Sequence, residues 1–366
     1  MHELTALELG LVVNELKPKV EKGFLKKFYD LGNGSFKMVF YREGVNTIVY
    51  CKLCVTINET KFSEEAGAAT DFAMGVRKRI EGSLVHEIEQ YDSDRIVVIK
   101  FSDFRLVIEM FGKGNLVLVG NDGKTALAYK SIEYRDRAVK ARAVYLFPKS
   151  SFIEIEGLDQ ATAKYIAEAA RDSEDKLIVA LARTINVGPI YLEDIIRRCG
   201  LEPNGKLHAD DDVHALEHEI LRFSKELSSY KARSYAVEGG REYSVLHLLK
   251  FKDMPTTEYD SLCALLDELH VASRTAVDDS AKSKALTEVD ANIQKQRALA
   301  DGLANDSISY SSMGNKIFER MDDINALVEY MRRNKKADVK ELEREFPGLG
   351  VKSVDLKNKT VAISVE

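Results

Sequence analysis

An acidic and a basic side chain stand side by side at Asp94-Arg95, just before the apolar run IVVIKF. An arginine guanidinium can bind a phosphate or a base edge through its fork of N–H donors. An adjacent carboxylate can orient that fork or accept a hydrogen bond from a base amine. The pair therefore has the chemistry of a nucleic-acid contact. The alternative is a charged pair at the start of a strand with no binding role. Judged from these two residues alone, this alternative is favoured. Asp92, two residues earlier, could be mistaken for the functional aspartate of this pair.

Further basic side chains are grouped at two places in the first half of the chain. Arg77-Lys78-Arg79 lies in a predicted helix, where three consecutive cations point around the axis and at most two can face one line of phosphates. The second group consists of Arg135, Arg137 and Arg142. For both groups, phosphate contact and a solvated surface are equally supported alternatives.

Two motifs suggest other chemistries and have simpler explanations. Cys51-x-x-Cys54 has the spacing of a zinc or redox pair, but it falls in a predicted strand, where residues three apart point to opposite faces. Buried apolar thiols are the favoured interpretation. The segment from Gly112 to Asn115, GKGN, lacks the GxxxxGK[ST] spacing of a phosphate loop and lies between two predicted strands. It is predicted to be a hairpin turn, and no nucleotide cofactor is expected.

His214 and His218 are four residues apart beside the acidic run Asp210–Asp212. This spacing can place two imidazoles on one helix face, as in a zinc site. No glutamate follows His214, so the HExxH pattern is not met. An exposed acidic helix is the favoured interpretation, and no metal site is predicted.

These candidates must be positioned by a β-rich region, predicted to span residues 1–155. Its strand-like runs are FKMVFY, TIVYCKLCVTI, RIVVIKF, FRLVIEMF and NLVLV, separated by Gly, Asn and Asp turn signals. An opening helix is predicted from the capping box of Thr5 and Glu8, with Leu4 and Leu9 at the flanking apolar positions. A second helix is predicted at about 68–82. The region is expected to be a mainly antiparallel β-sandwich with flanking helices.

From about residue 156 the apolar period becomes helical, and residues 156–278 are predicted to form a helix-hairpin-helix-type helical domain with a connecting segment. In LARTINVGPIYLEDIIRRCGL two helical stretches flank a Gly-Pro turn, whose amides can face a phosphate. An ordinary small helical bundle explains the same pattern and is favoured by the pattern alone.

Residues 279–335 carry a heptad repeat that predicts a coiled-coil arm. One seam position holds Leu286, Ile293, Ala300, Met321 and Val328, and the other holds Val289, Leu303, Ile317, Ile324 and Met331. Gln296, Ser307, Tyr310 and Gly314 interrupt the seam and predict a soft point or break in its middle. The chain has no second heptad, so the seam stays unpaired or pairs with another molecule, for instance in a homodimer. Residues 336–366 are expected at the tip of the arm, ending in a hairpin with an Asn-Lys turn.

The overall composition narrows the protein class. A chain of 366 residues is expected to form more than one domain. Its net charge of −6 argues against indiscriminate coating of nucleic acid. The four cysteines are too few for a disulfide framework, and no apolar run suggests a signal peptide or membrane span, so a cytoplasmic location is predicted.

Several blocks together resemble the NEMF/RqcH/FbpA (NFACT) family of ribosome quality-control factors, over essentially the whole chain. They are VRKRIEGSLVHEIEQYDSDRIVVIKF, LVIEMFGKGNLVLVGNDGK, YRDRAVKARAVYLFP, LARTINVGPIYLEDIIRRCGL and YDSLCALLDELH. The resemblance implies an α+β, multidomain protein whose first domain is similar to formamidopyrimidine-DNA glycosylases. It also implies a non-enzymatic scaffold that binds the large ribosomal subunit with its stalled peptidyl-tRNA. Such a scaffold recruits tRNA for mRNA-independent C-terminal tailing, while the ribosome performs the chemistry.

The resemblance also assigns residues. Asp94 and Arg95 match the family's Asp-Arg pair, which is implicated in tRNA handling and tailing. Glu8 stands where the family usually carries an aspartate tied to tailing, and the change moves the charge outward by one methylene. Its structural alternative is the capping box. Arg77-Lys78-Arg79 matches the family's basic helix.

Departures from the family pattern leave alternatives. Full-length members continue through a second coiled-coil arm into a C-terminal RNA-binding domain, which are missing from this sequence, so we expect a truncated form. A DNA-glycosylase-like enzyme would need an N-terminal proline or another nucleophile, but the chain opens Met1-His2-Glu3. A fibronectin-binding adhesion protein is suggested by the family's name, and the lack of an export signal counts against it.

Overall fold

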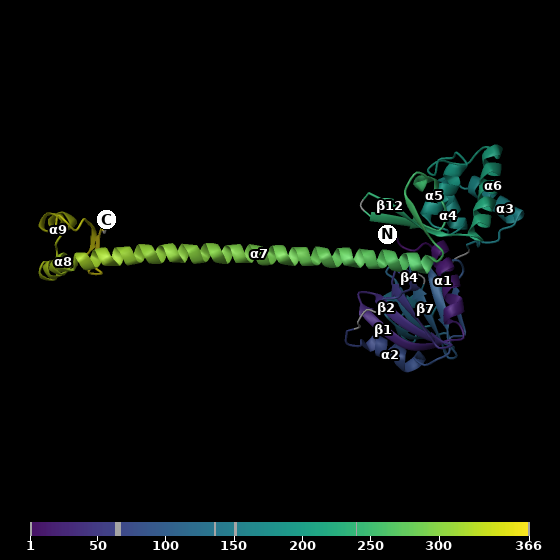
Figure 1. Ribbon diagram of the computed structural model, residues 1–366, viewed down its shortest axis with the longest axis horizontal. Coiled ribbons are helices and arrows are strands. Elements are labelled where there is room, and N and C mark those ends of the chain that lie inside the picture. The colour runs from purple at the N-terminus through teal and green to yellow at the C-terminus, as the bar shows by residue number, and fades with distance from the viewer. Residues whose placement is uncertain (1, 63–66, 135–136, 150–151, 239, 365–366) are drawn as a thin grey trace. The chain divides into compact units, whose positions relative to one another are not determined.

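The computed structural model describes residues 2–62, 67–134, 137–149, 152–238 and 240–364, and it gives only the helical backbone for residues 272–288. Contacts divide the chain into two compact units, Met1–Arg274 and Thr275–Glu366. The first unit contains the antiparallel sheets and short helices drawn from purple to green in Figure 1. The predicted α+β class with mainly antiparallel sheets is therefore confirmed.

The first sheet has four antiparallel strands in chain order, β1 (Phe24–Gly32), β2 (Ser35–Arg42), β3 (Val45–Lys52) and β4 (Thr56–Glu59). It is flanked by α1 (Ala6–Val20) and α2 (Asp71–Ile80), so both predicted helices of this region are confirmed. Helix α1 begins where it was predicted to begin. The Glu8 N–H donates to the Thr5 hydroxyl and the Glu8 carboxylate accepts from the Thr5 N–H, which completes the capping box.

The second sheet has five antiparallel strands in chain order, β5 (Glu87–Gln90), β6 (Ile96–Lys100), β7 (Phe104–Glu109), β8 (Asn115–Gly120) and β9 (Thr125–Ala128). Alternate residues of β6 face different apolar clusters. Val97 and Ile99 join the main core, whereas Ile96 and Val98 pack on the other face with Val139. Covering both faces explains why this strand is almost continuously apolar in the sequence. A two-stranded ribbon, β10 (Ile132–Glu133) and β11 (Ala138–Val139), follows.

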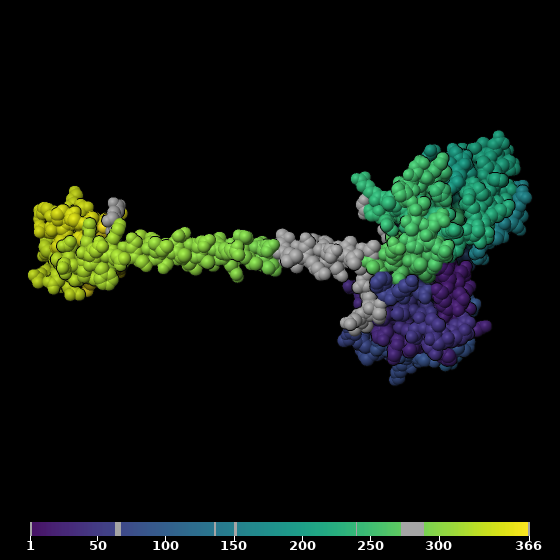
Figure 2. Space-filling view, in the orientation of Figure 1, coloured from purple at the N-terminus to yellow at the C-terminus, as the bar shows by residue number. Residues whose placement is uncertain are grey.

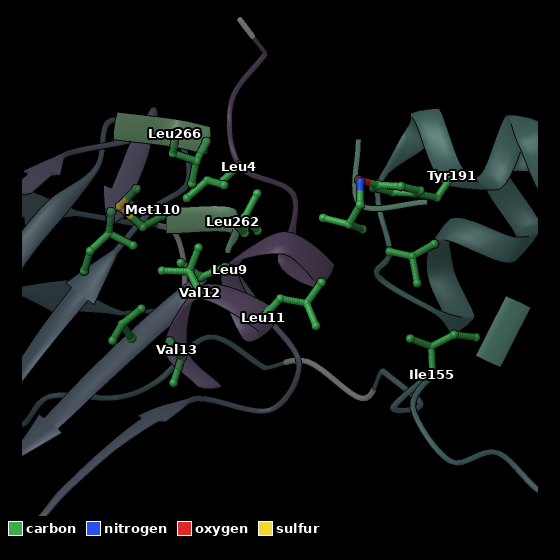
Figure 3. Close-up of a cluster of buried hydrophobic side chains, with 14 of the residues drawn as sticks. Leu4, Leu9, Leu11, Val12, Val13, Met110, Ile155, Tyr191, Leu262 and Leu266 are labelled. Atoms are coloured by element: carbon green, nitrogen blue, oxygen red, sulfur yellow. The ribbon is translucent and has the colours of Figure 1, made fainter. Parts of the chain in front are cut away.

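Helix α1 lies at the centre of the main core. Its apolar residues leave the helix in several directions, and Leu9, Val12 and Val13 are at most 1% exposed. In the close-up of Figure 3, Leu9 and Val12 lie on the side of Leu262, while Leu11 faces the side of Ile155. One continuous buried cluster therefore joins the sheets, α1 and the helices that follow.

The next part of the first unit contains α3 (Gln160–Arg171), α4 (Leu177–Thr184), α5 (Pro189–Arg198) and α6 (Asp210–Leu227). The predicted helical hairpin is confirmed as α4 and α5 around the turn at 185–188. The expected connecting segment differs. It forms an antiparallel sheet of β13 (Gly240–Ser244), β12 (Ala232–Val237) and β14 (Thr256–Tyr259), with the 3-10 turn η1 (Leu249–Phe251) before β14. Its strands are only four to six residues long and have no regular apolar–polar alternation, so they lack the pattern that marks a strand in sequence.

Helix α7 (Leu262–Glu319) crosses the unit boundary without interruption. Of the predicted soft point or break between 296 and 314, the break is therefore wrong, and the soft point stays a prediction. The helix ends instead at Arg320, before α8 (Met321–Arg333). Where the seam positions are exposed to solvent, polar residues at them reduce the stability of the helix only slightly. Val289 and Leu303 are 54% and 62% exposed, and in Figure 2 the visible face of this stretch carries no other element of the second unit. The side chain of Leu286 lies outside the described residues.

The second unit has a small core of its own beyond α7. It is formed by α8, α9 (Val339–Glu345), β15 (Val351–Asp355) and β16 (Thr360–Ile363). The last two elements are the predicted hairpin, which is confirmed. Ile324 and Met331, expected on the coiled-coil seam, pack here against the buried Leu327 and Leu342. Among the described residues, none of the helices combines the length and apolar character needed to cross a bilayer.

Candidate nucleic-acid interface

The Asp94-Arg95 pair lies at the tight turn between β5 and β6. Asp92 and Ser93 take positive φ angles of 50° and 48°, and the Asp94 N–H donates to the Tyr91 carbonyl at 2.9 Å. Two consecutive left-handed residues are typical of a turn that follows the twist of an antiparallel pair. This turn brings Asp94 and Arg95 to the end of the sheet, immediately before the rigid strand β6.

The Asp94 carboxylate connects this turn to the helical hairpin. Its Oδ1 accepts from the Arg95 N–H at 2.7 Å and from the Asn186 amide nitrogen at 3.4 Å. Asn186 belongs to the turn between α4 and α5, and its amide also lies 3.4 Å from the Ser93 carbonyl. Burial raises the pKa of Asp94, although hydrogen bonding and the charge of Arg95 act in the opposite direction. The carboxylate is thus held in a fixed position at an unfavourable site for a charge.

The Arg95 guanidinium is anchored at one end and keeps hydrogen-bonding capacity. Its Nη2 donates to Glu3 at 2.9 Å and to the Cys54 carbonyl at 3.4 Å. Its Nε has no hydrogen-bond partner among the described residues. The Glu3 side chain is 59% exposed, and such surface ion pairs stabilise by only about 0–1 kcal/mol. A phosphate or base edge could therefore replace Glu3 at little cost.

Arg95 lines a cavity of about 660 Å³ with residues from four parts of the first unit. The residues lining it that matter here are Glu3, Thr5, Asn186, Gly188, Glu242 and Lys250. Gly188 has a φ of 100°, and a Cβ at this position would lie 2.4 Å from Thr5 Cγ2, so the close approach requires glycine. Gly188 is also the N-cap of α5, whose positive end therefore borders the cavity.

Glu8 lies behind this cavity and is completely buried. Its carboxylate accepts from the Tyr191 hydroxyl at 2.6 Å and the Tyr243 hydroxyl at 3.5 Å, and the His2 Nε2 lies 3.0 Å away. The His2 ring stacks on Tyr243 with centroids 4.1 Å apart. Because the Glu8 carboxylate is buried and already accepts hydrogen bonds within the fold, this structure does not present it to a ligand, and its tRNA contact stays a prediction. Glu8 instead joins the N-terminus, α5 and β13.

The two tyrosines are fixed as donors to Glu8. Burial and the nearby charge of Glu8 raise the pKa of Tyr191 and of Tyr243 well above the ordinary value. The Tyr191 hydroxyl also accepts from the Val245 N–H at 3.2 Å. This network supports the side of the cavity formed by the N-terminal residues and the α5 turn.

The basic residues of α2 lie away from this cavity. Arg77 is half-buried, and its Nε donates to the Phe28 carbonyl at 2.7 Å. Lys78 and Arg79 are exposed, and Arg77 and Lys78 line a separate groove. Phosphate contact by these residues stays a prediction.

The second basic group is divided by the structure. Arg137 is buried, and its Nη1 donates to Glu109 at 2.7 Å, so it is less available for the predicted phosphate contact than an exposed arginine. Its charge is used inside the protein, where Glu109 also accepts from the Tyr145 hydroxyl at 2.8 Å. Arg142 is exposed and remains a candidate. Arg135 lies outside the described residues.

The cysteine motif differs from the prediction in one respect. Cys51 is buried in β3, where burial raises its pKa to about 12, but Cys54 lies in the turn after the strand with a φ of 64°. Both are free thiols. His214 and His218 are exposed on α6, and the described part of the chain contains no cluster of three or more side chains suited to a metal. The segment starting at Gly112 is a turn between β7 and β8, as predicted.

Glu3 and Asn186 are site residues that sequence reasoning missed. The Gly-Pro turn marked the neighbourhood of Asn186, but its contact with Asp94 joins residues 92 positions apart. No local sequence pattern predicts a contact between residues so far apart in the chain.

Comparison with known proteins places these features in a family. Residues 5–347 match the sequence model described as NFACT N-terminal and middle domains. The archaeal Rqc2 homolog aRqcH of Methanocaldococcus jannaschii is 20% identical over 309 residues, covering 80% of this chain and 46% of the relative. Ribosome quality control complex subunit 2 of Saccharomyces cerevisiae is 28% identical over 156 residues, covering 41% of this chain and 15% of the relative. The chain thus matches less than half the length of either curated relative.

Two solved structures share the fold at low identity. The fibrinogen binding protein from Staphylococcus aureus aligns with a TM-score of 0.58 and 19% identity, covering 72% of this chain and 97% of the other. The N-terminal part of the fibronectin/fibrinogen-binding protein from Streptococcus suis aligns with a TM-score of 0.59 and 16% identity, covering 74% and 100%. At these identities the likeness shows the fold alone.

Proposed function

The chain belongs to the NFACT family, and from this premise we propose that it binds tRNA and the large ribosomal subunit in ribosome-associated quality control. The subunit carries a stalled peptidyl-tRNA, and the recruited tRNA serves mRNA-independent C-terminal tailing of the nascent chain. The protein acts as a cytoplasmic scaffold, and the ribosome performs the peptidyl transfer. The names of the archaeal and yeast relatives support this proposal.

The observation that carries the proposal is the cavity that joins the Asp94-Arg95 turn to the turn before α5. Arg95 offers guanidinium N–H donors beside an exposed and replaceable carboxylate. Asp94 holds the backbone of Arg95 and the amide of Asn186. The positive end of α5 favours an anion at the same border. Together these groups suit the phosphate and base edge of a nucleotide in RNA.

The test compares the wild-type chain with Arg95→Ala in binding to labelled tRNA and to isolated large ribosomal subunits over a salt series. Loss of hydrogen bonds from a charged donor should weaken tRNA binding by about 10- to 150-fold. Loss of one phosphate contact should also reduce the slope of log K against log salt by about 0.7–0.9. The thermal midpoint should change little, because the Arg95 ion pair is exposed.

Arg233→Ala is a matched control. Arg233 is 19% exposed against 23% for Arg95, and each arginine pairs with one exposed glutamate, Glu258 or Glu3. Arg233 does not line the cavity. Equal affinity of wild type and Arg95→Ala would remove Arg95 from the site. Failure of the wild-type chain to bind either ligand would contradict the proposed function for this chain.

A further inference from the structure

A second groove of the first unit has two exposed aromatic side chains. Phe24 of β1 and Tyr41 of β2 stand directly opposite each other in the antiparallel pair, so both leave the sheet on the same face. They are 46% and 40% exposed, whereas Phe28, Phe36 and Phe40 of the same strands are at most 1% exposed. These two solvent-exposed rings lie on one face of the sheet beside a groove. They form a surface on which a flat ligand can stack.

Cations surround these rings because of a local irregularity. The strand register passes from Leu25 opposite Phe40 to Lys27 opposite Val39, so Lys26 is the extra residue of a β-bulge. A bulge redirects the side chain it carries. Lys26 lines the groove with its Nζ 5.5 Å from the centre of the Tyr41 ring.

The last turn of α2 supplies the other wall of the groove through Arg77 and Lys78. Glu81 lines the groove as well, but its Oε1 accepts from Lys27 at 2.8 Å, so a neighbouring cation offsets its charge. Among the described residues Lys78 has no ion-pair partner. The groove therefore combines surplus positive charge with stacking surfaces.

We propose that this groove binds an unpaired stretch of RNA, with bases stacked on Phe24 and Tyr41 and phosphates bound by Lys26 and Lys78. Aromatic side chains beside cations bind single strands with little sequence preference, since every base has a π-face. A duplex keeps its bases inside and cannot stack on both rings. The site shares no residue with the Arg95 cavity and does not depend on its function.

The experiment measures the anisotropy of a labelled oligouridine of roughly ten nucleotides, and of an RNA duplex of the same length, with the full chain. Tyr41→Ala and Phe24→Ala should each weaken single-strand binding by about 5- to 150-fold. Tyr41→Phe should retain the affinity because the ring remains. Lys78→Ala should reduce the slope of log K against log salt by about 0.7. Tyr165→Ala, which removes an aromatic side chain 61% exposed on α3, is the matched control and should have no effect.

Three results would overturn the proposal. One is oligouridine affinity that neither aromatic variant changes, with circular dichroism confirming that both are folded. Another is equal affinity for duplex and single strand, which would indicate phosphate binding alone. The third is self-association of the chain that Tyr41→Ala abolishes, which would make the groove a contact between copies. Arg95→Ala should leave oligouridine binding unchanged, so this groove and the tRNA site can fail separately.

Discussion

Two regions of the first unit contain the same chemical groups, an arginine beside a carboxylate near the end of a strand, and use them differently. At Arg137 the guanidinium and its partner Glu109 are 5% and 0% exposed, and the Tyr145 hydroxyl also donates to Oε1 of Glu109. At Arg95 the guanidinium faces a cavity, its carboxylate partner Glu3 is 59% exposed, and its Nε has no partner among the described residues.

The difference is how deeply each arginine and its carboxylate partner are buried in the fold. Arg137 pairs its charge with Glu109, its Nη1 donates to Glu109 and to the Leu146 carbonyl, and its side chain is only 5% exposed to a ligand. Arg95 is held in position by Glu3 and the Cys54 carbonyl, and it lines a cavity next to an exposed, replaceable carboxylate. We therefore expect stability to depend on Arg137 and ligand binding to depend on Arg95.

Arg137→Ala tests the buried Arg137–Glu109 pair and should have the largest effect on stability. It leaves Glu109 buried without its cation, and breaking such a pair costs about 3–5 kcal/mol. The loss should appear as a lower midpoint in urea unfolding followed by circular dichroism. Binding of tRNA, measured where the variant is folded, should stay within about twofold of wild type, because its ΔΔG is near zero.

The double variant Arg137→Met with Glu109→Gln is the control for this prediction. It removes both charges together, keeps an acceptor for Tyr145, and should recover part of the stability, because replacing a whole buried pair costs less than breaking it. Near-normal stability of Arg137→Ala combined with weaker tRNA binding would contradict the comparison. Arg137 would then be a phosphate contact, as the sequence predicted.

Glu15 offers an intermediate case, a partly buried carboxylate whose partners are neutral. It accepts from the Leu262 and Cys263 N–H groups at 2.6 and 3.0 Å, and from the hydroxyls of Tyr230 and Ser261. It thereby caps the first turn of α7 on α1. Burial alone would raise the pKa of Glu15, but these hydrogen bonds outweigh it and lower the pKa.

Glu15→Gln should cost about 1–2 kcal/mol at pH 7, as expected for a charged helix cap. A folded-state pKa below the unfolded value gives stability that is present above about pH 4.3 and lost as the pH falls through the folded-state pKa. Thermal midpoints of variant and wild type should therefore converge as the pH falls through the folded-state pKa of Glu15. Faster hydrogen exchange at Leu262 and Cys263 would confirm the location of the effect. Glu226→Gln, which alters an exposed ion pair, should change little.

The amino-acid sequence predicted elements best where the pattern is local. The capping box of Thr5 and Glu8, the helical hairpin around Gly188 and the final hairpin each depend on residues a few positions apart. The sheet of β12, β13 and β14 was not predicted because its strands are short and lack apolar alternation, and because Tyr235 packs against Phe251, which lies outside the strands. The polar seam residues do not break α7, because a polar side chain weakens a coiled-coil seam only where a partner helix covers it.

The candidate site could be predicted only in part, for a related reason. Asp94 and Arg95 were identifiable from their types and from the family resemblance, but burial decides what an ionisable side chain can do. Glu8 and Arg137 have the right chemistry and are inaccessible, with exposures of 0% and 8%. Asn186 became a site residue only when folding placed the α4–α5 turn beside Asp94.

Asp94→Asn tests the region of Asp94 and Arg95 at the cavity and should have the smallest effect on stability. Burial raises the pKa of Asp94, so its charged form is disfavoured in the fold and stability falls as the pH rises through the folded-state pKa. An amide of the same shape avoids this cost. The thermal midpoint at pH 7 should therefore equal or exceed that of wild type, with no difference below about pH 3.5. Binding of tRNA should nevertheless weaken, because the carboxylate is the group suited to accept hydrogen bonds from a base amine. Asp92→Asn, at the same turn, should leave affinity unchanged. A lower midpoint with full affinity would make Asp94 a structural residue like Glu109 and remove the distinction between the two regions.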